Sequence, residues 1–136
     1  MSLLSRPHPW SAWRKSVLAT FLLATVAINA QVQAKETLAS LEIVALSALP
    51  REAQKTHQLI LTGGPFPYEK DGVVFGNRER ILPKYPSGYY REYTVPTPGA
   101  RNRGARRLVC GGKPPRTPDV CYYTGDHYSS FKRVVQ

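Results

Sequence analysis

Acidic residues are scarce in this chain. Among its 136 residues, nine Asp and Glu stand against nineteen Lys and Arg, so the formal net charge is +10. A surplus of this size does not determine a fold, but it favours polyanionic partners. Nucleic acid, anionic lipid and acidic polysaccharide are the partner classes that this charge leaves open.

A long hydrophobic run is also missing. A membrane-spanning helix needs about 20 consecutive apolar residues. The most apolar stretch, from Val17 to Ala30, is about 14 residues long and is interrupted by Thr20, Thr25 and Asn29. Its length argues against an uncleaved membrane anchor, and the basic residues that precede it are typical of a secretory signal.

The predicted signal occupies residues 1–34. Val32 and Ala34 lie at the minus-three and minus-one positions and favour cleavage after Ala34. Residues 35–136 then form one domain with a single modest core. We expect this domain to be exported, to the medium or the periplasm, and to have no membrane association after cleavage.

Only two cysteines are present, Cys110 and Cys121, and there is no CxxC, no second cysteine pair and no HxxxH. This set is too small for the usual zinc sites, so no metal is expected. The two cysteines flank "GGKPPRTPDV", whose Gly and Pro content is typical of the loop of a long hairpin. A cross-strand disulfide is therefore plausible in an exported protein, and a free buried Cys110 is the alternative.

One segment has the pattern of a good helix. It begins in "SALPREAQKTHQLILTGGP", where Pro50 stands near the first turn and Gly63, Gly64 and Pro65 mark the end. His57 lies inside this segment, and without a partner motif we expect it on the helix surface.

The rest of the chain is β-prone. Short runs separated by Gly and Pro predict an antiparallel sheet, and one helix with such a sheet predicts an α+β domain in which the helix covers one face. The Gly-rich loops GxGxxG and GxxxxGK[ST] are absent. The runs are "GVVFGN", "ERIL", "GYYREYTV", "RRLVCGG", "VCYYTG" and "SFKRVV".

Strand alternation places an acid and an arginine together. In "YYREYTV" it sends Tyr90, Glu92 and Thr94 to one face and the alternate residues to the other. In "RRLVC" it sends Arg107 and Val109 outward. If the helix covers the opposite face, Glu92 and Arg107 share an open surface. The residues expected under the helix are Tyr89, Arg91, Tyr93, Val95, Leu108 and Cys110.

Such a surface suits cleavage of RNA. The reaction needs a base for the 2′-hydroxyl proton, cations around the phosphate and an acid for the leaving oxygen. Glu92, the arginines Arg103 and Arg107, and His127 are residues of the right types, and no metal or cofactor is required. The alternatives are an ordinary surface ion pair with a solvated histidine, or a non-enzymatic cationic protein that binds nucleic acid or cell-surface polyanions.

Four segments resemble the secreted guanyl-specific ribonucleases of bacteria, a group that includes streptomycete enzymes and barnase. They are "LSALP", "GPFPYEKDGVVFGNRERILP", "GYYREYTVPTPGARNRGARRLVCGG" and "YYTGDHYSSF". The resemblance runs from about Leu46 to Phe131. It implies the microbial ribonuclease fold and an endoribonuclease that cleaves single-stranded RNA 3′ of guanosine. It also implies a 2′,3′-cyclic phosphate that is then hydrolysed to the 3′-phosphate.

The resemblance also implies residue roles. Glu92 matches the general base, His127 the general acid, Arg103 and Arg107 the phosphate-binding arginines, and Tyr128 a tyrosine that contacts the phosphate and borders the base site. The guanine pocket is implied by "FGNRE"; without the resemblance, "NRE" reads as an ordinary turn with a salt bridge. The implied guanine-binding residues are Phe75, Gly76, Asn77, Arg78 and Glu79.

The chain departs from its relatives at two places. Gly76 stands where they usually carry a longer or polar side chain, which puts the rigidity of that loop in question. Ala45 replaces the first cysteine of the streptomycete terminal bridge, so a Cys110–Cys121 bridge is the expected substitute. The resemblance also makes a monomer and a barstar-like inhibitor in the producing cell reasonable expectations.

Overall fold

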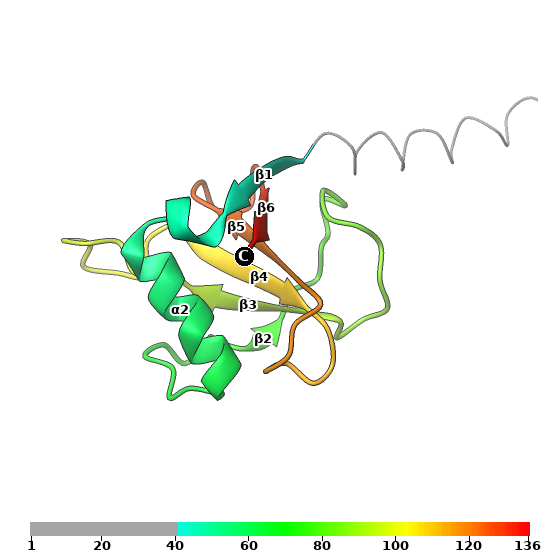
Figure 1. Cartoon of the computed structure of the whole chain (residues 1–136), viewed down its shortest axis with the longest axis horizontal. Helices are drawn as coiled ribbons and strands as arrows, with labels where there is room; N and C mark the ends of the chain where they lie inside the picture. The colour runs from blue at the N-terminus through cyan, green and yellow to red at the C-terminus, as the bar shows by residue number, and fades with distance from the viewer. Residues whose placement is uncertain (1–40) are drawn as a thin grey trace, which may run out of the picture. The chain divides into compact units, whose positions relative to one another are not determined.

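The computed structural model describes residues 41–136. The predicted signal 1–34 and its cleavage after Ala34 lie outside these residues and stay predictions. The described part is one helix against a six-stranded sheet with the strand order β1-β6-β5-β4-β3-β2 (Figure 1). Its elements are β1 Glu42–Ala45, the 3-10 turn η1 Leu46–Ala48, α2 Arg51–Thr62, β2 Val73–Val74, β3 Tyr90–Thr94, β4 Arg107–Gly111, β5 Val120–Thr124 and β6 Lys132–Val135.

The helix α2 begins and ends where the sequence predicts. Pro50 precedes it, and Gly63 ends it in the left-handed conformation at φ 79°, which glycine adopts without a steric penalty. The N–H groups of Gly63 and Gly64 donate to the carbonyls of Ile60 and Leu59 at 3.2 and 2.9 Å. The last turn of the helix is therefore closed by its own backbone.

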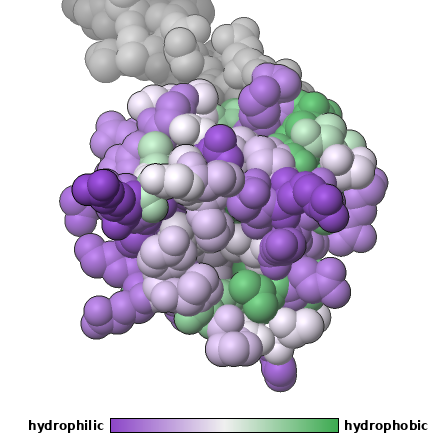
Figure 2. Space-filling view, turned by 90° about the vertical axis from the view of Figure 1, so that its left-hand side faces the viewer, coloured by the Kyte–Doolittle hydropathy of each residue, from purple (hydrophilic) through white to green (hydrophobic). Residues whose placement is uncertain are grey.

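The expectation for His57 is wrong. Its side chain is only 6% exposed, because positions 53, 56, 57 and 60 form one stripe of the helix, three and four residues apart, that faces the sheet. Burial lowers the pKa of His57 below its ordinary value. The outer side of α2 is polar, and Figure 2 shows a mostly hydrophilic surface on the side of the molecule where α2 and the loop after β3 lie.

The predicted sheet is correct for most of its length. Strands β2 to β6 are paired in antiparallel fashion. Two points differ: β1 was not predicted and pairs in parallel with β6, and "ERIL" forms no strand. Residue 80 takes φ 54°, and the side chain of Asn77 bonds both the N–H and the carbonyl of Leu82. These bonds replace strand pairing in that segment.

The face of the sheet under α2 carries the main core. Tyr93, Val95, Leu108 and Cys110 pack there with residues of α2, as the alternation predicts. Cys110 and Cys121 are directly paired across β4 and β5, and a disulfide of 2.04 Å joins them. No free cysteine remains among residues 41–136.

The opposite face is less open than the alternation suggests. A second cluster covers part of it, where Tyr90 is 3% and Val109 0% exposed. Tyr89 belongs to this cluster as well, and not to the helix side as predicted. It precedes the first residue of β3, so strand alternation does not apply to it. A side chain at position 111 would run into its ring, which explains the glycine there.

Candidate active site

A groove of about 900 Å³ opens beside the second apolar cluster. It brings the middle of β3 together with the loop after β2 and the loop between β5 and β6. Its lining consists of residues 74–79, Ile81, Glu92 and residues 127–129. All five residues predicted to bind guanine and three others predicted for the site, Glu92, His127 and Tyr128, thus line one cavity.

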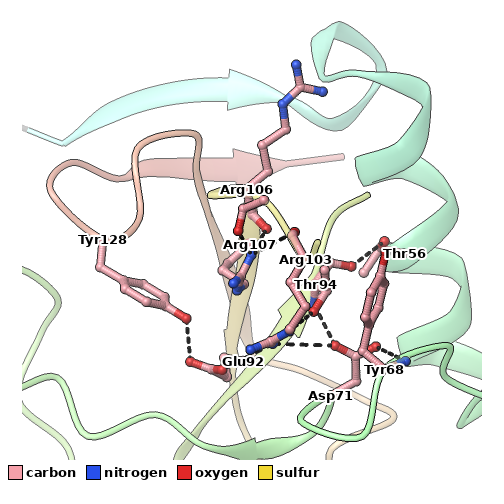
Figure 3. Close-up of polar contacts among 10 residues, drawn as sticks. Thr56, Tyr68, Asp71, Glu92, Thr94, Arg103, Arg106, Arg107 and Tyr128 are labelled. Carbon is pink, nitrogen blue, oxygen red and sulfur yellow. Dashed lines mark hydrogen bonds and ion pairs between the residues drawn. The ribbon is translucent and has the colours of Figure 1, made fainter. Parts of the chain in front are cut away.

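Glu92 is one of the two carboxylates that line this groove, the other being Glu79, and both oxygens of Glu92 are engaged. The hydroxyl of Tyr128 donates to Oε2 at 2.5 Å, and Nη2 of Arg103 lies 3.4 Å from Oε1 (Figure 3). Burial, followed by the hydrogen bond to Glu92, raises the pKa of Tyr128 to about 12. Tyr128 therefore stays protonated near neutral pH and acts there as a hydrogen-bond donor.

Thr94 and Asp71, which the sequence analysis did not single out, hold the side chain of Arg103 in position. Its Nε donates to Oγ1 of Thr94 at 2.9 Å, and Nη2 lies 3.9 Å from Asp71. The side chain of Asp71 is only 1% exposed and accepts the N–H of Thr94 at 2.7 Å and that of Tyr68 at 3.2 Å. A buried carboxylate thus anchors β3 next to the arginine. "DG" alone suggests only a turn, so no sequence signal pointed to this contact.

Arg107 is buried and does not line the groove itself. Its Nη1 donates to the carbonyls of Gly104 and Arg106 at 2.9 and 2.7 Å, so the preceding loop wraps around it. Its positive charge opposes the rise in the pKa of Tyr128, which lines the groove. Within residues 41–136, its Nε is the one buried side-chain N or O atom without a partner. Arg106, in contrast, extends away from the cluster (Figure 3).

The loop after β5 presents His127 and Tyr128 in an unusual backbone conformation. Both have positive φ, 56° and 73°, a region that costs energy for residues other than glycine. Asp126 holds the turn: its carboxylate accepts bonds from Oγ1 of Thr124 and from the N–H and Oγ of Ser130. The bonds from Ser130, followed by that from Thr124, lower the pKa of Asp126 to about 2.

The segment predicted to read guanine forms the other wall. Phe75 donates its N–H to the carbonyl of Tyr90 at 2.9 Å, and its ring lies 5.1 Å from that of Tyr128. Asn77 takes φ 46° and turns its amide inward to Leu82. The N–H groups of residues 76–79 donate to no other group of the described chain, and Glu79 makes no ion pair there. No salt bridge therefore closes this turn among the described residues, and the guanine-binding role of the loop stays a prediction.

Two further features are absent from residues 41–136. This part of the chain contains no group of three or more His, Cys, Asp or Glu residues that could hold a metal ion. Nor does it contain a helix that is both long and apolar enough to cross a membrane.

A carboxylate, a histidine and arginines around one groove are the groups that a phosphodiester-cleaving enzyme with a tethered nucleophile requires. A family model described as ribonuclease matches residues 31–135, and the chain belongs to this family. Its similarity within the family is to the guanyl-specific ribonucleases. Family membership favours an enzyme over the non-enzymatic cationic protein.

The relatives support this grouping. Guanyl-specific ribonuclease Sa of Kitasatospora aureofaciens is 56% identical over 93 residues, which cover 68% of this chain and 93% of that protein. Ribonuclease Sa3 of the same organism is 56% identical over 91 residues, 67% of this chain and 62% of that protein. A crystal structure of ribonuclease Sa2 with guanosine-2′-cyclophosphate matches with a TM-score of 0.64 at 47% identity, covering 71% of this chain and 97% of that one.

Proposed function

We propose that the chain is an exported, metal-independent endoribonuclease that cleaves single-stranded RNA on the 3′ side of guanosine. The observation that carries the proposal is the placement of Glu92: its carboxylate lies in the groove between Arg103 and Tyr128, opposite the loop 75–79. The guanyl specificity of the named relatives and the guanosine cyclic phosphate in the Sa2 structure support the same substrate.

In the first step, Glu92 takes the proton of the guanosine 2′-hydroxyl while O2′ forms a bond to phosphorus. The P–O5′ bond breaks, and His127 gives a proton to the leaving 5′-oxygen. The product is a 2′,3′-cyclic phosphate. Arg103 and Arg107 stabilise the negative charge on the phosphate oxygens, a task for which the planar guanidinium is suited. DNA lacks the 2′-hydroxyl and is not cleaved.

In the second step, water attacks the cyclic phosphate and the two residues exchange roles. His127 takes a proton from the water, and Glu92 returns one to O2′ as the P–O2′ bond breaks. The product is a 3′-phosphate. Activity therefore follows a bell-shaped curve in pH, because the first step needs Glu92 ionised and His127 protonated.

Guanine is recognised through its Watson–Crick edge. Its O6 accepts hydrogen bonds, and its N1–H and N2–H donate them, so free backbone N–H groups beside one carboxylate are complementary to it. The backbone of residues 76–78 and the carboxylate of Glu79 supply this pattern, and Phe75 and Tyr128 provide apolar walls. Adenine does not fit this pattern, because it has a donor at N6, an acceptor at N1 and no amino group at C2.

The dinucleotides GpU and ApU, incubated with the mature protein in EDTA, test the proposal. We expect cleavage of GpU only, and loss of that cleavage in the Glu92→Ala/His127→Ala double variant. Failure to cleave either dinucleotide would rule out the ribonuclease activity, equal cleavage would rule out the guanine preference, and an active double variant would rule out the site.

Export and assembly are separate parts of the proposal. Sequencing the N-terminus of protein recovered from outside the producing cell should find Lys35 first if the signal is cleaved after Ala34. A mature chain that still begins with the apolar run would contradict this cleavage. A monomeric state and a barstar-like inhibitor stay predictions.

A further inference from the structure

A pair of stacked tyrosines lies outside the groove and has no role in the mechanism above. The rings of Tyr85 and Tyr89 are nearly parallel, with centroids 3.9 Å apart and an angle of 11° between their planes. Tyr90 meets the ring of Tyr85 edge-on, at 5.9 Å and 88°. Tyr85 is nevertheless 50% exposed, and its stacked partner Tyr89 occupies one flat face only, so we infer that the other flat face is accessible.

Tyr89, the ring on which Tyr85 stacks, is fixed in place before any ligand arrives. Tyr89 lies over Gly111, where a side chain would run into its ring, and its hydroxyl donates to Asp119 at 3.2 Å. Tyr90 donates its hydroxyl to the carbonyl of Pro83 at 3.0 Å. Tyr85 stacks on the fixed ring of Tyr89, which reduces the freedom that Tyr85 loses when another flat group stacks on it.

Hydrogen bonds and apolar contacts connect the tyrosine pair with the wall of the groove. The side-chain amide of Asn77, in the groove wall, donates to the carbonyls of Leu82 and Pro83, and Phe75 is bonded to the carbonyl of Tyr90. Phe75, Tyr89 and Tyr90 also belong to the same apolar cluster. Tyr85 therefore lies at the far end of the loop that begins with the proposed guanine-binding residues.

The order of groups along β3 indicates the direction in which the RNA strand would run across the site. Tyr90 begins the strand and Thr94 ends it, with Glu92 between them and Arg103 bonded to Thr94. If the 3′-phosphate of guanosine lies at Glu92 and Arg103, the RNA that follows it leaves at that end. The part of the strand that can reach Tyr85 is then the nucleotide before the guanosine.

Local charge suits a nucleic-acid strand. Arg80 and Lys84 are exposed on the loop between the groove and Tyr85, where they are available to phosphates. Asp119 is the acid that bonds to the pair, and its carboxylate accepts the hydroxyl hydrogen of Tyr89. A cationic path beside an exposed aromatic ring is the common design of sites for single-stranded nucleic acid.

We propose that Tyr85 forms a stacking site for the base on the 5′ side of the guanosine. This inference rests on the proposed function. Because every base has a flat aromatic face, the site accepts any of the four bases. It increases affinity for 5′-extended RNA and does not change the preference for guanosine.

The test compares three substrates with one guanosine each: GpU, the 5′-extended ApGpU and the 3′-extended GpUpU. We expect Tyr85→Ala to raise KM for ApGpU by about five- to tenfold and to leave GpU and GpUpU unchanged. Tyr85→Phe should behave as the wild type, because it keeps the ring. Leu61→Ala, at an exposed position on α2, should change none of the three.

Each other outcome has a definite meaning. An unchanged KM for ApGpU, a loss confined to GpUpU, an equal loss on all three substrates, or a Tyr85→Phe variant as weak as Tyr85→Ala would overturn the stacking site. Failure of the wild type to cleave GpU would instead overturn the proposed function, so the two failures are distinguishable.

Discussion

The face of the sheet under α2 and the face that carries the groove are held by different contacts. Under α2, Val95 and Leu108 are fully buried, and the disulfide joins two strands inside the same apolar cluster. On the groove face, an apolar cluster covers only part of the sheet, and Glu92 and Arg103 are held by hydrogen bonds. Because neighbouring residues of one strand point to opposite faces, β3 serves stability and the site at once.

The two histidines of the described residues, His57 and His127, show the same contrast. His57 is buried against the sheet on the helix side, whereas His127 is exposed in the groove. His127 therefore keeps access to a ligand, while His57 is withdrawn from water. We therefore expect changes on one face to reduce activity and changes on the other to reduce stability.

The variant Glu92→Gln should separate activity from stability most strongly. Removal of a general base lowers kcat/KM for GpU by about 10²- to 10⁴-fold, while the similar shape of glutamine leaves urea unfolding almost unchanged. Glu69→Gln, at an exposed position, is the matched control and should be fully active. A Glu92→Gln variant with normal kcat/KM would place the base elsewhere.

Loss of the disulfide should reduce stability and leave activity unchanged. The bridge closes a short loop, with a sequence separation of 11, so Cys110→Ala/Cys121→Ala should lower the free energy of unfolding by about 3 kcal/mol in the chain-entropy account. Urea unfolding measures this loss. At temperatures where the variant is folded, kcat/KM for GpU should match the wild type; a folded but inactive variant would show that the two faces are not separable.

Thr94 and Thr56 offer a matched pair across the sheet. Thr94 accepts a bond from Arg103 through its side chain, and its carbonyl accepts one from Thr56 on α2 at 3.1 Å. Either change to Val should lower the free energy of unfolding by about 1 kcal/mol. Only Thr94→Val should also lower kcat/KM, by about tenfold, because Arg103 loses its acceptor. Equal activity of the two variants would contradict a positioning role for Thr94.

The smallest effect concerns pH and His57. Burial lowers its pKa below the ordinary value of 6.5, so the unfolded chain binds more protons than the native one in the range just below pH 6.5. Stability is therefore lost as the pH falls through that range. In His57→Gln, urea unfolding should depend less on pH there than in the wild type. An identical pH dependence would show that His57 is as hydrated as in the unfolded chain.

Much of this arrangement could be predicted from local patterns. Pro50 and Gly63 mark the limits of α2 because each restricts or permits a particular backbone conformation. Alternation along β3 and β4 correctly placed Glu92 and Arg107 on one face. It failed at Tyr89, which precedes the strand, and in "ERIL", where Asn77 captures the backbone of Leu82.

Contacts between distant residues could not be predicted in this way. Asp71 lies 23 residues from Thr94, and Tyr128 lies 36 from Glu92. Neither pair has a local signal, because the two partners meet only after the strands have found their register.

The helix, the alternation of the central strands and the residue types of the site follow from local sequence, since these depend on neighbouring residues. The burial of His57, the contacts of Asp71 and Thr94 with Arg103, and the stacking of Tyr85 beside the groove follow from the packed fold. Burial and hydrogen-bond partners depend on which elements pack together, and packing is a property of the whole sheet and its helix.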